Sequence, residues 1–188
     1  MTRIGIIVGS TRSSRVGDQV GAWVHGVASQ RTDAEFELID LATFALPVLD
    51  EPQMASTGVY EHEHTQRWSA AVGACDGYVF VTAEYNHGVP GALKNAFDFL
   101  YREWANKAVG FVSYGAEGGV RAVESWRVIV ANAHLADVRG AVHLRRYGGE
   151  FRQDVFTPEA HRAKELSALL DQVIAWTRAL AVLRDPAG

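Results

Sequence analysis

The segment "RIGIIVGSTRSSRVG", residues 3–17, joins an apolar run to a polar loop that is rich in hydroxyl groups. The run Arg3–Val8 predicts a buried strand because it is almost entirely apolar. The following stretch, Arg15–Ser29, carries apolar residues at helical spacing and predicts a helix. A strand, a loop and a helix in this order are the beginning of a parallel β-α-β arrangement.

The same alternation continues along the rest of the chain. The further predicted strands are Glu35–Asp40, Gly77–Thr82, Ala108–Ser113 and Ala141–Leu144. The further predicted helices are Thr65–Ala74, Gly91–Trp104 after Pro90, Val120–Ala133, and Pro158–Leu183 with Thr157 as its cap. Five strands that alternate with five helices predict a parallel sheet covered on both faces.

The order of the strands follows from their patterns. The runs at 3–8, 77–82 and 108–113 are apolar throughout and belong in the middle, whereas Glu35–Asp40 alternates and belongs at an edge. These features predict an α/β, flavodoxin-like three-layer sandwich with a five-stranded parallel sheet in the order 2-1-3-4-5. One domain over residues 1–188 is expected. The connection Leu41–His64 lacks periodicity, which is typical of functional or mobile loops.

The composition limits the class of function. The 188 residues are 48% hydrophobic, 21% are charged, and the net charge is −4, which argues against binding of nucleic acid or of a membrane surface. No apolar run approaches the roughly 20 residues of a membrane span, and no signal peptide is expected. The single cysteine, Cys75, cannot form an internal disulfide. A cytoplasmic location is therefore expected.

In a sheet of this order, ligands bind beyond the carboxyl ends of the central strands. Three polar, glycine-containing loops follow those strands, "GSTRSSR" at 9–15, "AEYNHGVPG" at 83–91 and "SYGAEGG" at 113–119. We name them the first, second and third loop. They are expected to converge.

The first loop offers groups that bind an anion. It precedes a helix, so backbone amides and the positive helix end face one point, and Arg12 or Arg15 can neutralise charge. The loop lacks the lysine of a Walker A motif, and Thr11 and Ser14 replace two glycines of a dinucleotide fingerprint. Its hydroxyl groups favour a terminal monophosphate. The alternative is a helix cap with two solvated arginines.

The second and third loops suit a flat heteroaromatic ring. Tyr85 can act as a platform, the backbone of Glu84–His87 can donate, and Gly88 and Gly91 are expected to allow a tight turn. The glycines of the third loop allow backbone to lie along a ring edge or a phosphate. Ordinary strand–helix turns remain the alternative for both loops.

Four segments together resemble the NADPH-dependent FMN reductase family of flavodoxin-like proteins. They are "GSTRSSRVG" at 9–17, "LPVLDEP" at 46–52, "EYNHGVPGALKNAFDFL" at 84–100 and "GFVSYGAEGGVRAVE" at 110–124. The resemblance covers roughly residues 3–145. It implies non-covalent FMN, NADPH or NADH as the electron donor, and a small-molecule acceptor such as a flavin or a quinone.

The resemblance also implies which residues hold the cofactor. The phosphate loop corresponds to Ser10, Arg12, Ser14, Arg15 and Val16. The loop along the isoalloxazine corresponds to Glu84, Tyr85, Asn86 and His87, and the loop at its pyrimidine end to Ser113, Gly115, Gly118 and Gly119. The chain departs from the family pattern at Ala83, where a proline is usual, and at Ser13–Ser14, where proline–glycine is common.

The implied activity is that of an FMN-dependent NAD(P)H oxidoreductase. Hydride chemistry belongs to the flavin N5, so no catalytic side chain is expected, nor is a metal. Donor and acceptor are expected to use one site in turn, by a ping-pong mechanism. A homodimer or homotetramer is expected through the helix Gly91–Trp104, whose apolar face is wide. An electron-carrying flavodoxin and a non-catalytic FMN-binding protein remain alternatives.

Overall fold

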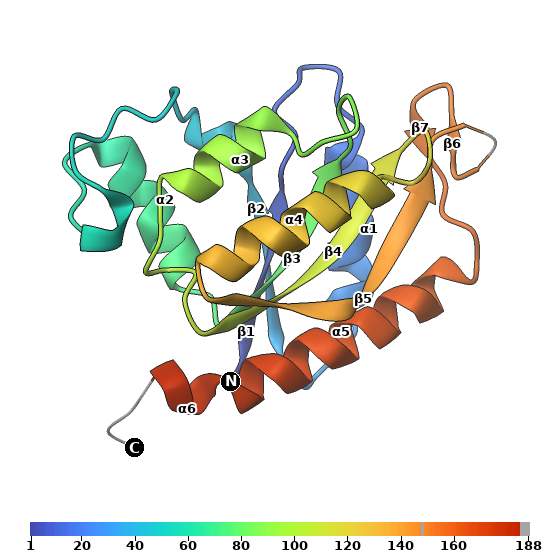
Figure 1. The fold of residues 1–188 in the computed structure, drawn as a ribbon. Coiled ribbons are helices and arrows are strands. Elements are labelled where there is room, and N and C mark those ends of the chain that lie inside the picture. Colours follow the sequence, from blue (N-terminus) through green and yellow to red (C-terminus); the bar gives the residue numbers. More distant parts are fainter. Residues whose placement is uncertain (148, 185–188) are drawn as a thin grey trace.

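A five-stranded parallel sheet lies between two layers of helices in the computed structural model, which describes residues 1–147 and 149–184 (Figure 1). The strands are β1 (Arg3–Val8), β2 (Glu35–Asp40), β3 (Gly77–Ala83), β4 (Lys107–Gly115) and β5 (Leu135–Arg145). Their order is β2-β1-β3-β4-β5, and every neighbouring pair is parallel. The predicted fold class and strand order are confirmed.

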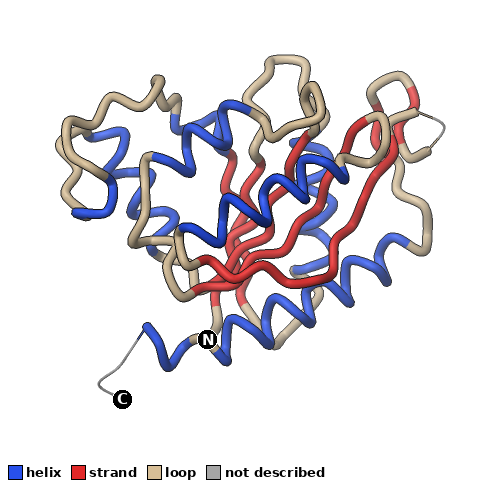
Figure 2. The backbone as a smooth tube through the Cα atoms, in the orientation of Figure 1, coloured by secondary structure: helices blue, strands red, loops and turns tan. Residues whose placement is uncertain are grey.

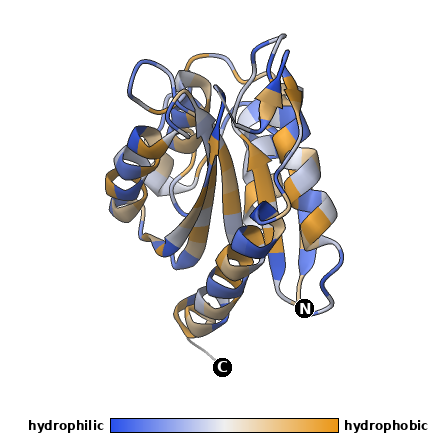
Figure 3. Ribbon diagram, turned by 90° about the vertical axis from the view of Figure 1, so that its right-hand side faces the viewer, coloured by the Kyte–Doolittle hydropathy of each residue, from blue (hydrophilic) through white to orange (hydrophobic). Residues whose placement is uncertain are grey.

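The helices divide between the two faces of the sheet. One face is covered by α1 (Gly17–Ala28) and α5 (Arg162–Ala179), and the other by α2 (Glu63–Gly73), α3 (Gly91–Asp98) and α4 (Val120–Asn132). Figure 3 shows the mainly apolar strands between these layers. β3 is buried along its whole length, as expected for a central strand. In the described part of the chain, no helix combines the length and apolarity needed to cross a membrane.

The helix predicted over Gly91–Trp104 is wrong at its carboxyl end. α3 stops at Asp98, and single turns follow, in which Leu100 N donates to Phe97 O and Trp104 N to Tyr101 O. The Trp104 indole also donates to Phe97 O at 3.0 Å. A buried indole therefore takes an acceptor that a longer helix would need, and packing overrides the helical pattern.

The start of the last helix is also wrong. α5 begins at Arg162 rather than at Pro158, and Thr157 N donates to Glu150 O at 2.7 Å. That bond closes a hairpin made of β6 (Phe151–Arg152) and β7 (Val155–Phe156). A short helix, α6 (Ala181–Arg184), follows α5.

β5 is much longer than the predicted strand Ala141–Leu144. Residues 135–137 also pair with β4, and the register then shifts between Val109 and Phe111, where β5 carries the additional residues 138–140. Arg127 holds them by an ion pair with Asp137 and a hydrogen bond to Val138 O at 3.0 Å. Charged residues and a bulge obscure the pattern of an edge strand.

The connection after β2 is fastened to the rest of the molecule. It contains two short 3₁₀ helices, Leu41–Phe44 and Ala55–Thr57. The Asn95 amide of α3 accepts from Leu49 N at 2.9 Å and donates to Pro47 O at 2.7 Å. Figure 2 shows this loop running beside α3. The loop therefore has a defined path despite its lack of periodicity.

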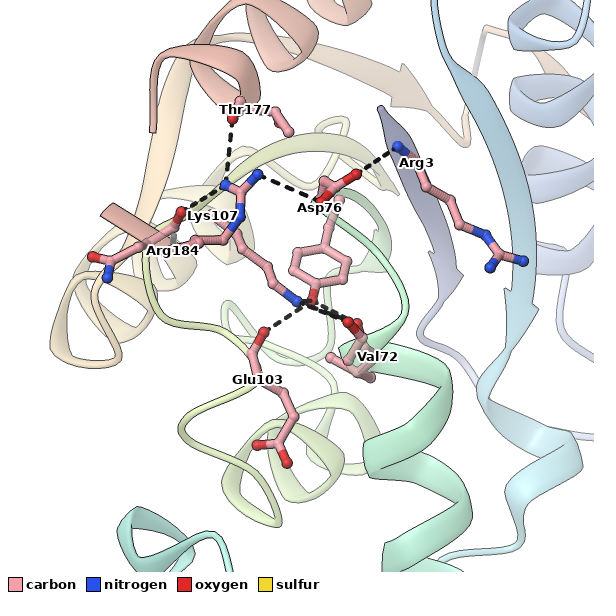
Figure 4. Close-up of polar contacts among 10 residues, drawn as sticks. Arg3, Val72, Asp76, Glu103, Lys107, Thr177 and Arg184 are labelled. Carbon is pink, nitrogen blue, oxygen red and sulfur yellow. Dashed lines mark hydrogen bonds and ion pairs between the residues drawn. The ribbon is translucent and has the colours of Figure 1, made fainter. Parts of the chain in front are cut away.

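Polar groups are buried at the amino edge of the sheet. Lys107, the first residue of β4, is 7% exposed and donates to Tyr78 Oη at 2.9 Å. Its amine also lies 3.5 Å from the carbonyl oxygens of Val72 and Gly73, at the end of α2 (Figure 4). The Lys107 amine is therefore surrounded by oxygen atoms of the protein itself.

Candidate functional site

The three loops do converge at the carboxyl edge of the sheet (Figure 1). The hydroxyl groups of Ser10 and Tyr85 lie 2.8 Å apart and join the first loop to the second. The second loop joins the third, because Glu84 N donates to Tyr114 O at 3.0 Å. The parallel register of β1, β3 and β4 brings these segments to one edge.

The first loop presents donors that the protein itself does not use. Residues 11–14 are exposed, and among the described residues their four amides donate to no backbone or side-chain acceptor. The loop runs directly into the amino end of α1. Unpaired amides at a helix start form a site for an anion such as a phosphate.

The two arginines of the first loop have different surroundings. Arg15 forms an ion pair with Asp40 at 2.5 Å and donates to Ser10 O at 3.1 Å, so it braces the loop against β2. Arg12 is exposed, forms no ion pair within the described part of the chain, and has only a 3.4 Å contact with Ser14 Oγ. Its guanidinium lies 6.0 Å from the centre of the Tyr85 ring. Arg12 is thus the cation that a bound anion can reach.

The other two predicted residues of the first loop are also placed. Ser14 is exposed beside Arg12, whereas the Val16 side chain is buried in the core under α1. Val16 can therefore meet a ligand only through its backbone.

The second loop turns tightly without using its glycines as expected. Tyr85 and Gly88 exchange two backbone hydrogen bonds, of 3.1 and 3.0 Å. The left-handed positions are Asn86 and His87, with φ of 50° and 65°, and both side chains are exposed. Gly88 has no positive φ, and a Cβ at Gly91 would meet nothing within 4 Å. The sequence-based assignment of the turn to these two glycines is therefore wrong.

Glu84 connects the second loop to the start of α4. Its carboxylate accepts from Arg121 N at 3.0 Å and from Arg121 Nη1 at 2.8 Å. The Glu84 side chain is only 7% exposed. A carboxylate at a helix start is stabilised by the helix dipole. Glu84 therefore acts here by fixing the geometry of two loops.

A short chain of hydrogen bonds holds the third loop. Ser113 Oγ donates to Gly118 O at 2.6 Å and lies 2.7 Å from His143 Nδ1. Because a hydroxyl has one proton, His143 Nδ1 must be the donor of the second bond. Burial lowers the pKa of His143, which favours the neutral ring. Gly119 has φ of 78°, and a Cβ there would lie 2.8 Å from Ser113 Cβ.

A hollow of about 320 Å³ lies between these loops. Predicted residues that line it are Arg12, Glu84, Tyr85 and Gly115. Its other lining residues include Ala83, Tyr114 and Ala116, which belong to the second and third loops but are not among the predicted site residues. The sequence interpretation missed Arg146 and Tyr147 altogether. Strand alternation puts Tyr114 on the same face as Val112, and this signal could have found it. Arg146 and Tyr147 follow β5, and no pattern in the sequence indicates that they reach this edge.

Tyr114 also explains a glycine at the start of α1. Its hydroxyl is buried and has no hydrogen-bond partner among the described residues. A Cβ at Gly17 would lie 2.4 Å from this hydroxyl. The first loop can therefore approach β4 closely only with glycine at position 17.

The residues present fit FMN. The first loop supplies unpaired amides, hydroxyl groups and Arg12 for a phosphate, and the hollow is bounded by the aromatic rings of Tyr85 and Tyr114. Its volume lies at the low end of the about 300–1,000 Å³ usual for ligand pockets. Across residues 1–147 and 149–184, no group of three or more histidine, cysteine or acidic side chains could hold a metal ion.

Two relatives of this chain are named NAD(P)H-dependent FMN reductases. NAD(P)H-dependent FMN reductase ntnL of Nectria sp. is 47% identical over 128 residues, 65% of this chain and 64% of that protein, so the chain spans just under two thirds of its length. NAD(P)H-dependent FMN reductase LOT6 of Saccharomyces cerevisiae is 32% identical over 189 residues, 94% of this chain and 98% of that one.

Solved structures show the same fold. FerB, a flavoenzyme NAD(P)H:(acceptor) oxidoreductase from Paracoccus denitrificans, has a TM-score of 0.75 at 19% identity, over 95% of this chain and 98% of its own. The sequence of residues 2–148 matches the family described as NADPH-dependent FMN reductase. The chain belongs to that family.

Proposed function

We propose that this protein is an FMN-dependent NAD(P)H oxidoreductase that reduces a flavin, a quinone or a similar small molecule. The observation that carries the proposal is the first loop, where four amides have no partner among the described residues and Arg12 lines the hollow. When bound there, FMN supplies the hydride acceptor and donor chemistry. The protein supplies position and charge.

The residues of the site have separate roles in this proposal. Arg12 and the first-loop amides bind the phosphate, together with the hydroxyl of Ser14. Glu84 and Ser113 hold the second and third loops through Arg121 and Gly118. Tyr85 bounds the hollow and is itself fixed by Ser10. No side chain needs to transfer a proton or form a covalent bond.

Electron donor and acceptor use the same site in turn. One hollow is bounded by all three loops, and Tyr85 lines it. Ping-pong kinetics follow, because the donor product must leave before the acceptor enters.

Initial rates with NADPH and benzoquinone test this function. We expect rapid NADPH oxidation by the FMN-loaded protein and parallel lines in double-reciprocal plots. Tyr85→Ala should slow both half-reactions in stopped-flow, whereas Tyr85→Phe should retain most of the rate because it keeps the ring. Intersecting lines, or an unaffected Tyr85→Ala protein, would contradict the shared site.

The same samples separate the alternative functions. An electron carrier would hold FMN but would oxidise NADPH only with a separate reductase. A protein that does not bind flavin would be colourless after incubation with FMN and gel filtration. Turnover without an added reductase favours the enzyme.

Assembly into a homodimer or homotetramer, with α3 and its surroundings at the interface, is part of the proposal. The apolar residues Leu93, Ala96, Phe97 and Leu100 are buried within the chain itself, so they are not a free face. Support comes instead from Val48 and Leu49, which are exposed on the loop that Asn95 holds. Light scattering should give a dimer or tetramer, and a fully active monomer at micromolar concentration would contradict this.

A cytoplasmic location is the remaining part of the proposal. A reducing compartment suits a dinucleotide-dependent reductase whose cysteine, Cys75, is a buried free thiol. Fractionation of cells with an antibody tests it, and recovery from a secreted fraction would contradict it.

A further inference from the structure

The hairpin formed by β6 and β7 stands beside the three loops at the carboxyl edge (Figure 1). It is firmly attached to the molecule. The Phe156 ring packs edge-on against the Trp23 ring of α1, with 5.5 Å between the ring centres. The Gln19 side chain accepts from Phe156 N at 2.9 Å and donates to Asp154 O at 2.8 Å. The Glu150 carboxylate, 1% exposed, forms an ion pair with Arg162 at 2.5 Å. These contacts hold the hairpin in a defined position beside the loops, and we call it the wall.

Two residues between β5 and this hairpin line the hollow. Arg146 and Tyr147 both line it, and Arg146 N donates to Gly115 O at 2.8 Å, which ties the wall to the third loop. Tyr147 is 74% exposed and presents an aromatic face to solvent. A ligand that extends out of the hollow on this side meets both side chains.

The charge of this wall suits an anion. Arg146 forms an ion pair with Asp154, whose side chain is 69% exposed, and such exposed pairs contribute little. Only Nη2 of Arg146 is used in this contact, so the other nitrogen atoms of the guanidinium remain donors. Arg12 adds a second positive charge to the lining, where the one carboxylate, Glu84, is already paired with Arg121. The lining is therefore net positive in a chain of net charge −4.

We propose that Arg146 binds the 2′-phosphate of NADPH and thereby makes this protein prefer NADPH to NADH. The inference rests on the proposed function. A planar guanidinium matches a phosphate dianion, and an exposed tyrosine such as Tyr147 can stack on the adjacent adenine. NADH lacks the phosphate and gains nothing from Arg146.

The kinetic test compares both nucleotides with the FMN-loaded protein. Arg146→Gln should lower kcat/KM for NADPH at least about tenfold, as expected for a lost charged hydrogen bond, and change it less than about twofold for NADH. Arg152→Gln is the matched control, because Arg152 is an exposed arginine of the neighbouring strand β6 that does not line the hollow. It should change neither value. Equal losses for both nucleotides in Arg146→Gln would overturn the proposal.

A binding test does not depend on turnover. Calorimetric titration of the FMN-loaded protein with adenosine 2′-monophosphate should show binding that Arg146→Gln weakens about tenfold and Arg152→Gln leaves intact. Adenosine should bind equally to all three proteins. An unchanged affinity for adenosine 2′-monophosphate would overturn the proposal even if the kinetics agreed.

Control titrations separate this inference from the proposed function. The affinity for FMN should be the same in wild type and Arg146→Gln. A tenfold loss of FMN affinity would instead assign Arg146 to the flavin and overturn the inference. If the wild type holds FMN but oxidises neither nucleotide, the proposed function fails, and the calorimetric result still decides whether Arg146 recognises the 2′-phosphate.

Discussion

At the amino edge of the sheet, the buried Lys107 amine meets three oxygen atoms, whereas at the carboxyl edge Arg12 is exposed and has no ion pair among the described residues. Both edges therefore carry a cation, but only the cation at the carboxyl edge is available to bind a ligand. Figure 4 shows a second internally satisfied cation at the amino edge, Arg184, which lies between Asp76 and Thr177. The contrast separates groups that stabilise the fold from groups that can bind a ligand.

Removing the amine of Lys107 tests the stabilising role of the amino edge. Burial lowers the pKa of Lys107 from 10.5 to about 8, so the unfolded chain binds more protons between these values. The free energy of unfolding of wild type, relative to Lys107→Met, should therefore rise by about 3 kcal/mol between pH 8 and pH 10.5. Chemical denaturation at several pH values measures this difference.

The control for this prediction is Lys164→Met, because Lys164 is exposed on α5. Denaturation of this variant over the same pH range shows what the loss of an exposed amine does, for comparison with the loss of the buried one. FMN affinity should be unchanged in Lys107→Met, since the two edges lie at opposite ends of the strands. A large loss of FMN affinity in Lys107→Met would contradict the claim that only the carboxyl edge binds the ligand.

Gly17 tests whether the carboxyl edge is also closely packed. Gly17→Ala should destabilise the protein by about 1–3 kcal/mol, because the new methyl group meets the Tyr114 hydroxyl. Tyr114→Phe should recover most of this loss in the double variant. In the control Gly26→Ala, the added Cβ of the same helix meets nothing within 4 Å, and stability should rise slightly. Denaturant titration would refute the account if Tyr114→Phe gave no recovery.

His143 gives a smaller, acid-dependent effect at the carboxyl edge. Burial holds its folded-state pKa below 6.5, so the unfolded chain binds the extra proton first, and stability falls as pH falls through 6.5. His143→Asn keeps a donor near Ser113 but does not titrate. The stability of wild type relative to His143→Asn should decline below pH 6.5, which chemical denaturation at several pH values measures. A flat difference for His143→Asn would contradict a buried neutral ring.

The order of the sheet could be predicted because the apolar and polar residues within each strand indicate how deeply that strand is buried. β1, β3 and β4 have apolar sequences and are buried on both faces, while the sequence of β2 alternates and this strand lies at the edge. The first loop, where we propose that the phosphate binds, could be singled out from the sequence for a related reason. Its amides, hydroxyl groups and arginines are adjacent in sequence, and a helix start follows them.

The rest depends on contacts between distant residues. Arg15 turns toward Asp40, 25 positions away, so its sequence neighbours do not reveal which arginine remains available. Arg146 lines the hollow, and its amide bonds to Gly115, 31 positions earlier in the chain, beyond the β4–β5 pair. α3 ends early because a buried indole competes for a carbonyl. Such competition is decided by packing, which periodicity does not record.

The affinity of the cofactor-free protein for FMN and for riboflavin tests the central claim most directly. Fluorescence titration of wild type and Arg12→Ala measures both, with exposed Arg139→Ala as the control. If the first loop holds the phosphate, Arg12→Ala should weaken FMN binding at least about tenfold and leave riboflavin binding nearly unchanged. Equal losses of affinity for the two ligands, or no loss for FMN, would contradict the claim that Arg12 binds the FMN phosphate.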